Sequence, residues 1–200
     1  VNNKTGYDFA RGLRSILRQD PDVVMLGEIR DEETARIAIQ SSLTGHLVMS
    51  TVHTNSAVGA ITRLRDMGIE SFLLASSLKT IISQRLVRRL CNECKSETKV
   101  SQRAIELLGL KKGQTVFSAK GCNHCDGTGY KGRIAIAESI QISTDLKDMI
   151  HDEASEQDIH KIAFKDIQTI DQIGSELLTQ GLTSPEELIR INNQQEDASI

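Results

Sequence analysis

The sequence predicts an α/β fold in which helices cover a parallel sheet. Val23–Gly27 is a short continuous apolar run, which is typical of a strand buried on both faces. Asp31–Gly45 follows with apolar residues at helical spacing, and His46–Asn55 then reads as a second strand leaving into a loop. Ser56–Gly68 is again amphipathic. The order strand, helix, strand, helix favours a parallel sheet.

Local signals support each of these elements. Acids crowd the first turn of the helix predicted over Asp31–Gly45, and Gly45 supplies its stop. The second helix ends at Gly68. Ile69–Leu90 is expected to be a longer helical stretch with a basic end at Arg85–Leu90.

The composition changes at Cys91, and the next residues are rich in Cys, Gly, Lys and Thr. Ile134–Ile142 alternates and predicts a strand, and the remainder is expected to be helical. The clearest helix start has Ser184 as N-cap, Pro185 at the first position and Glu187 reaching back from the third.

We therefore divide the chain into three segments. Residues 1–90 are the sheet-containing part, residues 91–133 a cysteine-containing subdomain, and residues 134–200 a mainly helical region. The polar tail from Asn192 to Ile200 is expected to fray.

Bulk properties exclude some function classes. The net charge of −3 and the absence of Trp argue against nucleic acid as the main partner. No apolar run approaches the ~18 residues of a membrane span, and no secretory leader is visible. Because the chain begins with Val1, we expect it to be an excerpt whose true start lies upstream.

The four cysteines form two C-x-x-C pairs, the pattern of a tetrahedral zinc site. With no sign of export, metal is favoured over disulfides. Four thiolates would fill the coordination shell, so the zinc is expected to be structural. His124 is expected to be exposed, and Gly127 and Gly129 allow a tight turn. The predicted ligands are Cys91, Cys94, Cys122 and Cys125.

Two other interpretations of this region were weighed. Gly127–Gly132 has phosphate-loop spacing, but Arg133 and Ile134 stand where Lys and Ser or Thr belong, so a nucleotide loop is rejected. The stretch CDGTG completes C-x-x-C-x-G-x-G, which resembles one repeat of the DnaJ-type chaperone zinc module. A chaperone-like module stays the alternative for this segment.

Glu28 lies where the first predicted strand ends, and ligands of α/β sheets bind at carboxyl ends of strands. It fits a residue that orients water for phosphoanhydride hydrolysis, and equally a helix N-terminal acid. His53, in STVHTN after the second strand, fits a phosphate sensor or a histidine held by turn bonds. For His46 the structural interpretation is favoured. Arg14 and Arg18 share a helix face that is ordinarily solvated.

Three segments together resemble one family, the hexameric secretion ATPases of type II secretion and type IV pilus assembly. They are ARGLRSILRQDPDVVMLGEIRD, SLTGHLVMSTVHTNSAVGAITRLRDMGI and QRLVRRLCNEC with GCNHCDGTGYKGR. The stretch RLRDMGIESFLLASSL resembles the secretion branch of this family more than the pilus branch.

The resemblance implies the C-terminal part of a RecA-like P-loop ATPase core that works as a ring with ATP and Mg²⁺. VVMLGEIRD resembles the Walker B segment, with Glu28 the catalytic glutamate. GHLVMSTVHTN resembles the His box, with His53 near the γ-phosphate and His46 in support. The same resemblance implies the zinc subdomain, and it assigns subunit contacts or activity to the basic residues Arg14, Arg18 and Arg133.

It also implies a cytoplasmic homo-hexamer peripheral to the inner membrane, where it meets the secretion platform proteins and drives pseudopilus assembly. Gly27 departs from the Asp that many phosphate-loop enzymes carry there, and the phosphate loop itself has no counterpart. The fragment alone is therefore expected to be inactive. The alternatives are a pilus assembly ATPase of the same family and a non-enzymatic, zinc-stabilised interaction module.

Overall fold

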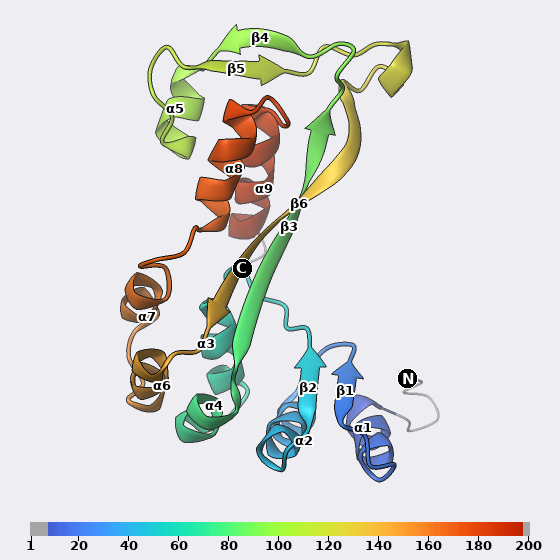
Figure 1. Ribbon diagram of the computed structural model, residues 1–200, viewed down its shortest axis with the longest axis vertical. Helices are drawn as coiled ribbons and strands as arrows, with labels where there is room; N and C mark the ends of the chain where they lie inside the picture. Colours follow the sequence, from blue (N-terminus) through green and yellow to red (C-terminus); the bar gives the residue numbers. More distant parts are fainter. Residues whose placement is uncertain (1–7, 198–200) are drawn as a thin grey trace. The chain divides into compact units, whose positions relative to one another are not determined.

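The computed structural model describes residues 8–197, and the side chains of residues 8–193 (Figure 1). The chain forms two compact units: Val1–Ile81 with Ser139–Lys165, and Ile82–Glu138 with Asp166–Ile200. Unit 1 contains α1 (Phe9–Leu17), β1 (Val23–Leu26), α2 (Glu32–Leu43), β2 (Leu47–Ser50), α3 (Gly59–Asp66), α4 (Ser71–Ser77), α6 (Thr144–His151) and α7 (Glu156–Ala163).

Unit 2 contains β4 (Ser96–Lys99), α5 (Gln102–Leu108), β5 (Thr115–Ser118), the short 3-10 turn η2 (Asn123–Cys125), α8 (Ile170–Thr179) and α9 (Pro185–Asp197). The strands β3 (Thr80–Leu90) and β6 (Tyr130–Gln141) pair with each other, and the division between the units falls within them. The sequence-based segments 1–90, 91–133 and 134–200 stay a prediction.

The predicted parallel strand pair is confirmed in unit 1. β1 and β2 pair in parallel, from Val23 opposite Leu47 to Leu26 opposite Ser50 (Figure 1). The connecting helix α2 starts where its acids predicted, because the Asp31 side chain accepts a hydrogen bond from the Thr34 N–H at 2.8 Å. A parallel pair brings the carboxyl ends of both strands to one edge, which positions the residues that follow them.

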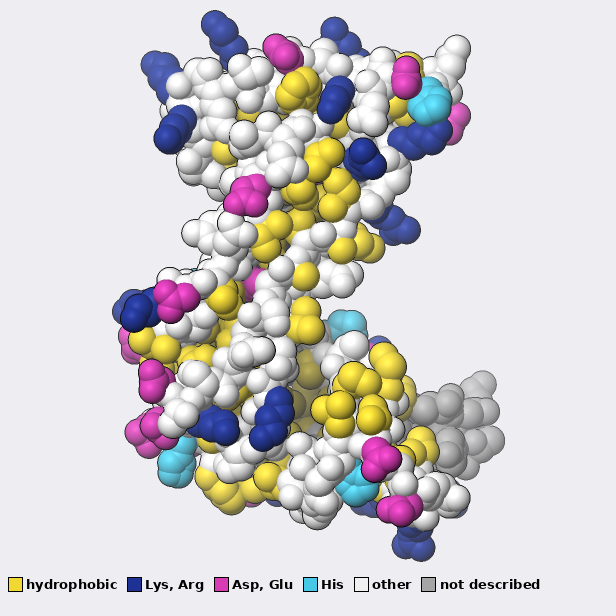
Figure 2. All heavy atoms as spheres, in the orientation of Figure 1, with side chains coloured by type: hydrophobic (Ala, Val, Ile, Leu, Met, Phe, Trp, Pro, Cys, Tyr) yellow, Lys and Arg dark blue, Asp and Glu magenta, His cyan; other side chains and the backbone are white. Residues whose placement is uncertain are grey.

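The two faces of this strand pair differ in exposure. Val24 and Leu26 are buried in a core with residues of α1, α2, α3 and α4. The opposite face carries four exposed apolar side chains, which gather over β1 and β2 in Figure 2. Their exposed fractions are 52% for Val23, 75% for Met25, 53% for Leu47 and 46% for Met49. Parallel sheets are ordinarily covered on both faces, so this face is unusual for a parallel pair.

The predicted helix over Ile69–Leu90 is wrong beyond its first turns. α4 ends at Ser77, Leu78 is already extended, and Thr80–Leu90 forms the strand β3. From Ile81 to Val87 every second residue of β3 is the more buried one, which is the two-residue period of a strand, and Leu90 is buried as well. Thr80, Ile81, Ile82 and Val87 are β-branched, and β3 is hydrogen-bonded to β6 along one edge. The strand predicted over Ile134–Ile142 is confirmed as part of β6.

The basic end Arg85–Leu90 is therefore not a helix terminus. Arg88 instead lies 4.1 Å from the ring centre of Tyr130 and forms a 2.7 Å ion pair with Glu187. Ser184 caps α9 as predicted and accepts a hydrogen bond from the Glu187 N–H. The polar tail predicted to fray is helical through Asp197, and residues 198–200 lie outside the described part.

Glu187 is a fully buried carboxylate that joins α9 to β3. It accepts hydrogen bonds from the N–H of Arg88 at 2.9 Å, from Nε of Arg88 at 2.8 Å and from Nη2 of Arg190 at 2.8 Å. Burial opposes ionisation, but the hydrogen bonds from Arg190 and Arg88 outweigh it and hold the pKa of Glu187 at about 2. The sequence pattern predicted only a helix-capping role for Glu187.

None of the helices between residues 8 and 197 combines the length and apolar character that a membrane crossing requires.

Replacing Glu187 by Ala is expected to lower the free energy of unfolding by about 3 kcal/mol, because a buried charge network loses its centre. Since its folded pKa lies below the ordinary 4.5, this stabilisation is full above pH 4.5 and fades as the pH falls toward about 2. Denaturant titrations at pH 7 and pH 3 measure both effects. The control Lys161→Ala removes an exposed 3.1 Å ion pair with Asp158 and should cost less than about 1 kcal/mol. Equal losses of unfolding free energy in Glu187→Ala and Lys161→Ala would contradict the interpretation of Glu187 as the centre of a buried charge network.

Candidate functional site

Glu28 and His53, predicted separately, are brought into contact in unit 1. Nε2 of His53 lies 3.0 Å from Oε2 of Glu28. Each residue follows one of the two parallel strands, so the pair lies at their carboxyl edge. This is the edge at which open α/β sheets bind ligands.

Backbone bonds continue beyond the strands and fix the two loops against each other. The Ile29 N–H donates to the Thr51 carbonyl at 3.0 Å, and the Thr51 hydroxyl donates to the Gly27 carbonyl at 2.7 Å. Glu28 is thus enclosed between two anchored residues. A Cβ at Gly27 would lie 3.4 Å from Cε1 of Phe9, an ordinary van der Waals contact, so packing against α1 does not by itself require glycine there.

Arg30 is a third member of this site, and the sequence reading missed it. Its Nε lies 2.6 Å from Oε2 of Glu28, the same oxygen that meets His53. The Glu28 side chain is 20% exposed, whereas those of Arg30 and His53 are 67% and 80% exposed. The contact with Arg30 is the main cause that lowers the pKa of Glu28, and the bond to His53 adds to it against partial burial. The signal in the sequence that could have identified Arg30 is its position in the stretch GEIR, where one residue separates it from Glu28.

Within residues 8–193, none of the other predicted nucleotide-site residues forms a hydrogen bond or ion pair with Glu28 or His53. His46 precedes β2, and its Nδ1 lies 3.0 Å from the Ser41 carbonyl at the end of α2. This contact matches the structural interpretation. Arg14 is exposed on α1 and pairs with Glu33 at 2.6 Å, and Arg18 caps the carboxyl end of α1. Arg133 is exposed on β6 in unit 2. Their assigned roles stay predictions.

The four cysteines form a compact cluster in unit 2. Their sulfur atoms all lie within 4.8 Å of one another. Three of the S···S distances are 3.9 Å for Cys91–Cys122, 3.8 Å for Cys94–Cys125 and 3.7 Å for Cys122–Cys125. Tetrahedral zinc with Zn–S bonds of about 2.3 Å requires sulfur edges of about 3.8 Å, so the donor set fits this ion.

The backbone around the second knuckle supports a thiolate. Burial of Cys125 opposes ionisation, but the N–H groups of Cys122 and Gly129 outweigh it and lower the pKa of this thiol, whereas burial raises the pKa of the neighbouring Cys94. Gly129 has φ +75°, and a Cβ there would lie 2.5 Å from that of Ala119, so the turn requires glycine. Gly127 also has a positive φ, and His124 is exposed, as predicted.

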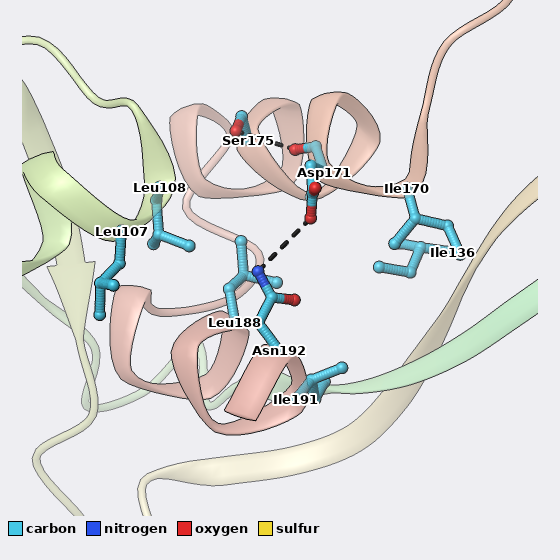
Figure 3. Close-up of a pocket in the computed structure, with 10 residues that line it drawn as sticks. Leu107, Leu108, Ile136, Ile170, Asp171, Ser175, Leu188, Ile191 and Asn192 are labelled. Atoms are coloured by element: carbon cyan, nitrogen blue, oxygen red, sulfur yellow. Dashed lines mark hydrogen bonds between the residues drawn. The ribbon is translucent and has the colours of Figure 1, made fainter. Parts of the chain in front are cut away.

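A cavity of about 190 Å³ in unit 2 contains none of the predicted site residues (Figure 3). Apolar side chains of α5, β6, α8 and α9 line it, with Asp171, Ser175 and Asn192 as its polar groups. Nδ2 of Asn192 lies 3.4 Å from Oδ1 of Asp171. This cavity brings no nucleophile or acid–base pair together.

Comparison with known proteins decides the family. Residues 1–190 match the family model described as "Type II/IV secretion system protein". The chain belongs to this family. The resemblance inferred from the sequence is thereby confirmed.

Curated relatives favour the secretion branch. The chain is 50% identical over 193 residues to the putative type II secretion system protein E of Escherichia coli K12, covering 96% of the chain and 39% of that relative. It is 50% identical over 196 residues to the type II secretion system ATPase E of Vibrio cholerae, covering 97% and 39%. The type IV pilus assembly ATPase PilB of Thermus thermophilus is 45% identical, covering 94% and 22%. The chain thus spans well under half the length of these relatives.

Solved structures confirm the α/β fold. The pilus retraction motor PilT with bound ADP superposes with a TM-score of 0.65 at 27% identity, over 92% of this chain and 43% of that one. The Legionella pneumophila ATPase DotB has a TM-score of 0.64 at 21% identity, over 94% and 42%, and supports the fold alone.

Replacing His53 by Ala is expected to raise the pKa of Glu28, because the carboxylate loses one of its two cationic or donor partners. Carbon-detected NMR titration of glutamate carboxyl groups measures this pKa. The control His151→Ala alters an exposed histidine at the end of α6 and should leave it unchanged. An unchanged Glu28 pKa in the His53 variant would show that the contact between these two side chains does not act on Glu28.

Proposed function

We propose that this chain is the Walker B, His-box and zinc-binding part of a motor ATPase that hydrolyses ATP to drive type II protein secretion. The observation that carries the proposal is the 3.0 Å contact of Glu28 with His53 at the carboxyl edge of the parallel pair. Membership of the family and the secretion ATPases among its relatives support it.

The chemistry assigned to the pair is the activation of water. Glu28, a carboxylate at neutral pH, accepts a hydrogen bond from the water that attacks the γ-phosphorus. The new P–O bond forms as the bond between the γ-phosphorus and the bridging oxygen breaks, ADP leaves with the electron pair of that bond, and the proton of the water passes by way of the Glu28 carboxylate to solvent. His53, 80% exposed, is free to reach the transferred phosphoryl group. Mg²⁺ would neutralise charge on the nucleotide; Gly27 provides no side-chain ligand for it.

The phosphate loop of the enzyme is assigned to protein outside these 200 residues, since the sequence contains no G-x-x-x-x-G-K-[ST] motif. The exposed face formed by Val23, Met25, Leu47 and Met49 is where further protein would complete the core. A cytoplasmic homo-hexamer that contacts the inner-membrane platform and assembles a pseudopilus is part of the same proposal. The chain alone is therefore proposed to be inactive.

Replacing Glu28 by Gln in the full-length protein that carries this chain should abolish ATP turnover, because the amide no longer orients and accepts from the attacking water. Nucleotide binding should persist. A steady-state phosphate-release assay and a binding titration with an ATP analogue measure the two properties. Retained turnover would remove Glu28 from the catalytic role.

The four cysteines are proposed to hold one structural zinc ion, which joins the knuckles of Cys91–Cys94 and Cys122–Cys125. Freshly purified, reduced protein should contain about one zinc per chain by elemental analysis. Cys94→Ser should lower this content and the thermal stability, because one of the four sulfur ligands is lost. Absence of zinc from the fresh wild-type protein would contradict the assignment.

The alternative is a non-enzymatic interaction module, which the cysteine cluster would also fit. Full-length protein that binds partners but shows no ATP turnover would favour it.

A further inference from the structure

The carboxylate of Glu28 is held at one oxygen by two partners. Nε of Arg30 lies 2.6 Å from Oε2, and Nε2 of His53 lies 3.0 Å from the same atom. Within residues 8–193, whose side chains the structure describes, no hydrogen bond or ion pair involves Oε1 of Glu28. Among these described side chains, one oxygen of Glu28 has two partners and the other has none.

The two partners differ in whether the proposed reaction requires them to leave Glu28. His53 is 80% exposed and follows a run of loop residues after β2, and its proposed role requires it to reach a phosphoryl group. It must release Oε2 when it does so. Arg30 lies two residues from Glu28 in the same loop between β1 and α2, and its contact is the shorter one.

An ordinary surface ion pair is the competing explanation for Arg30, since its side chain is 67% exposed. Such pairs hold two mobile side chains and contribute little. Glu28 is not a mobile partner, because only 20% of its side chain is exposed and its neighbours Gly27 and Ile29 are bonded to Thr51. The contact therefore acts on a carboxylate that the backbone already fixes.

We propose that Arg30 is a positioning residue that retains Oε2 of Glu28 when His53 turns to the nucleotide, and so keeps Oε1 available for the attacking water. This inference rests on the proposed ATPase function. The charged groups that act on Glu28 within the described part of the chain are Arg30 and His53. With His53 turned away, the contact with Arg30 holds the carboxylate in place.

The first test needs no enzymatic activity and uses this chain. The glutamate carboxyl groups are labelled with ¹³C, and Glu28 is assigned by comparison with Glu28→Gln. Arg30→Gln should raise the Glu28 pKa, Arg30→Lys should raise it less, and the double variant with His53→Ala should raise it most. The matched control is Lys161→Gln, which breaks another exposed ion pair of unit 1 and should leave Glu28 unchanged. An unaltered Glu28 titration in Arg30→Gln would overturn the proposal.

The second test uses the full-length protein that carries this chain. Arg30→Gln should lower kcat by about tenfold to a hundredfold and leave KM for ATP within about twofold, because positioning acts on the reacting water. The acid limb of the kcat profile should move to higher pH, and Arg30→Lys should restore most of the activity. A merely structural role would predict neither the pH change nor the rescue.

The outcomes separate the two proposals. Loss of turnover in Glu28→Gln with full turnover in Arg30→Gln overturns the role of Arg30 and retains the proposed function. Full turnover in Glu28→Gln overturns the proposed function itself. Loss of kcat in Arg30→Gln, with rescue by Arg30→Lys and the shifted pH profile, supports both.

Discussion

The parallel pairing of β1 with β2 is the constraint on which the candidate site depends. Its register sets Leu26 opposite Ser50, and the bonds from Ile29 to Thr51 and from Thr51 to Gly27 carry that alignment past the strand ends. Glu28 and His53, 25 positions apart, meet only because the two strands end at one edge. Displacing one strand by a residue would turn Val24 and Leu26 out of the core and separate the pair. The pairing of β1 with β2 therefore sets both the packing of the core and the positions of Glu28 and His53.

In unit 2, residues close to both cysteine pairs form hydrogen bonds with the turn between α8 and α9. The Leu90 N–H donates to the Leu182 carbonyl at 2.9 Å, and Nζ of Lys95 donates to the Gly181 carbonyl at 2.8 Å. Tyr130, next to Gly129, shares a 2.7 Å hydrogen bond with Ser184. Glu187 completes the link through Arg88. The cluster of sulfur atoms and the carboxyl-terminal helices therefore stabilise each other.

The sequence predicted the strands β1, β2 and β6, the helices α2 and α3 and the cysteine set because each leaves a local signal. An apolar run, a periodic pattern or a C-x-x-C spacing lies within a few residues. The strand β3 escaped prediction because Leu86, Val87 and Leu90 among arginines also fit a helix, and only pairing with β6 decides. The partners of Glu28 and Glu187 escaped for a related reason. The contacts of Glu28 with His53 and of Glu187 with Arg88 span 25 and 99 positions and leave no local pattern. Arg30 is only two positions from Glu28, but it looks like an ordinary surface cation in the sequence.

The central claim is that the edge formed by Glu28, Arg30 and His53 faces the reacting phosphate of a nucleotide. The most direct measurement is a structure of the full-length protein bound to ADP, Mg²⁺ and aluminium fluoride, which imitates the transferred phosphoryl group. The account predicts a water in line with the fluoride within hydrogen-bond distance of Oε1 of Glu28, with His53 turned to the fluoride and Arg30 still on Oε2. A nucleotide bound elsewhere, with Glu28 remote from its terminal phosphate, would contradict the account.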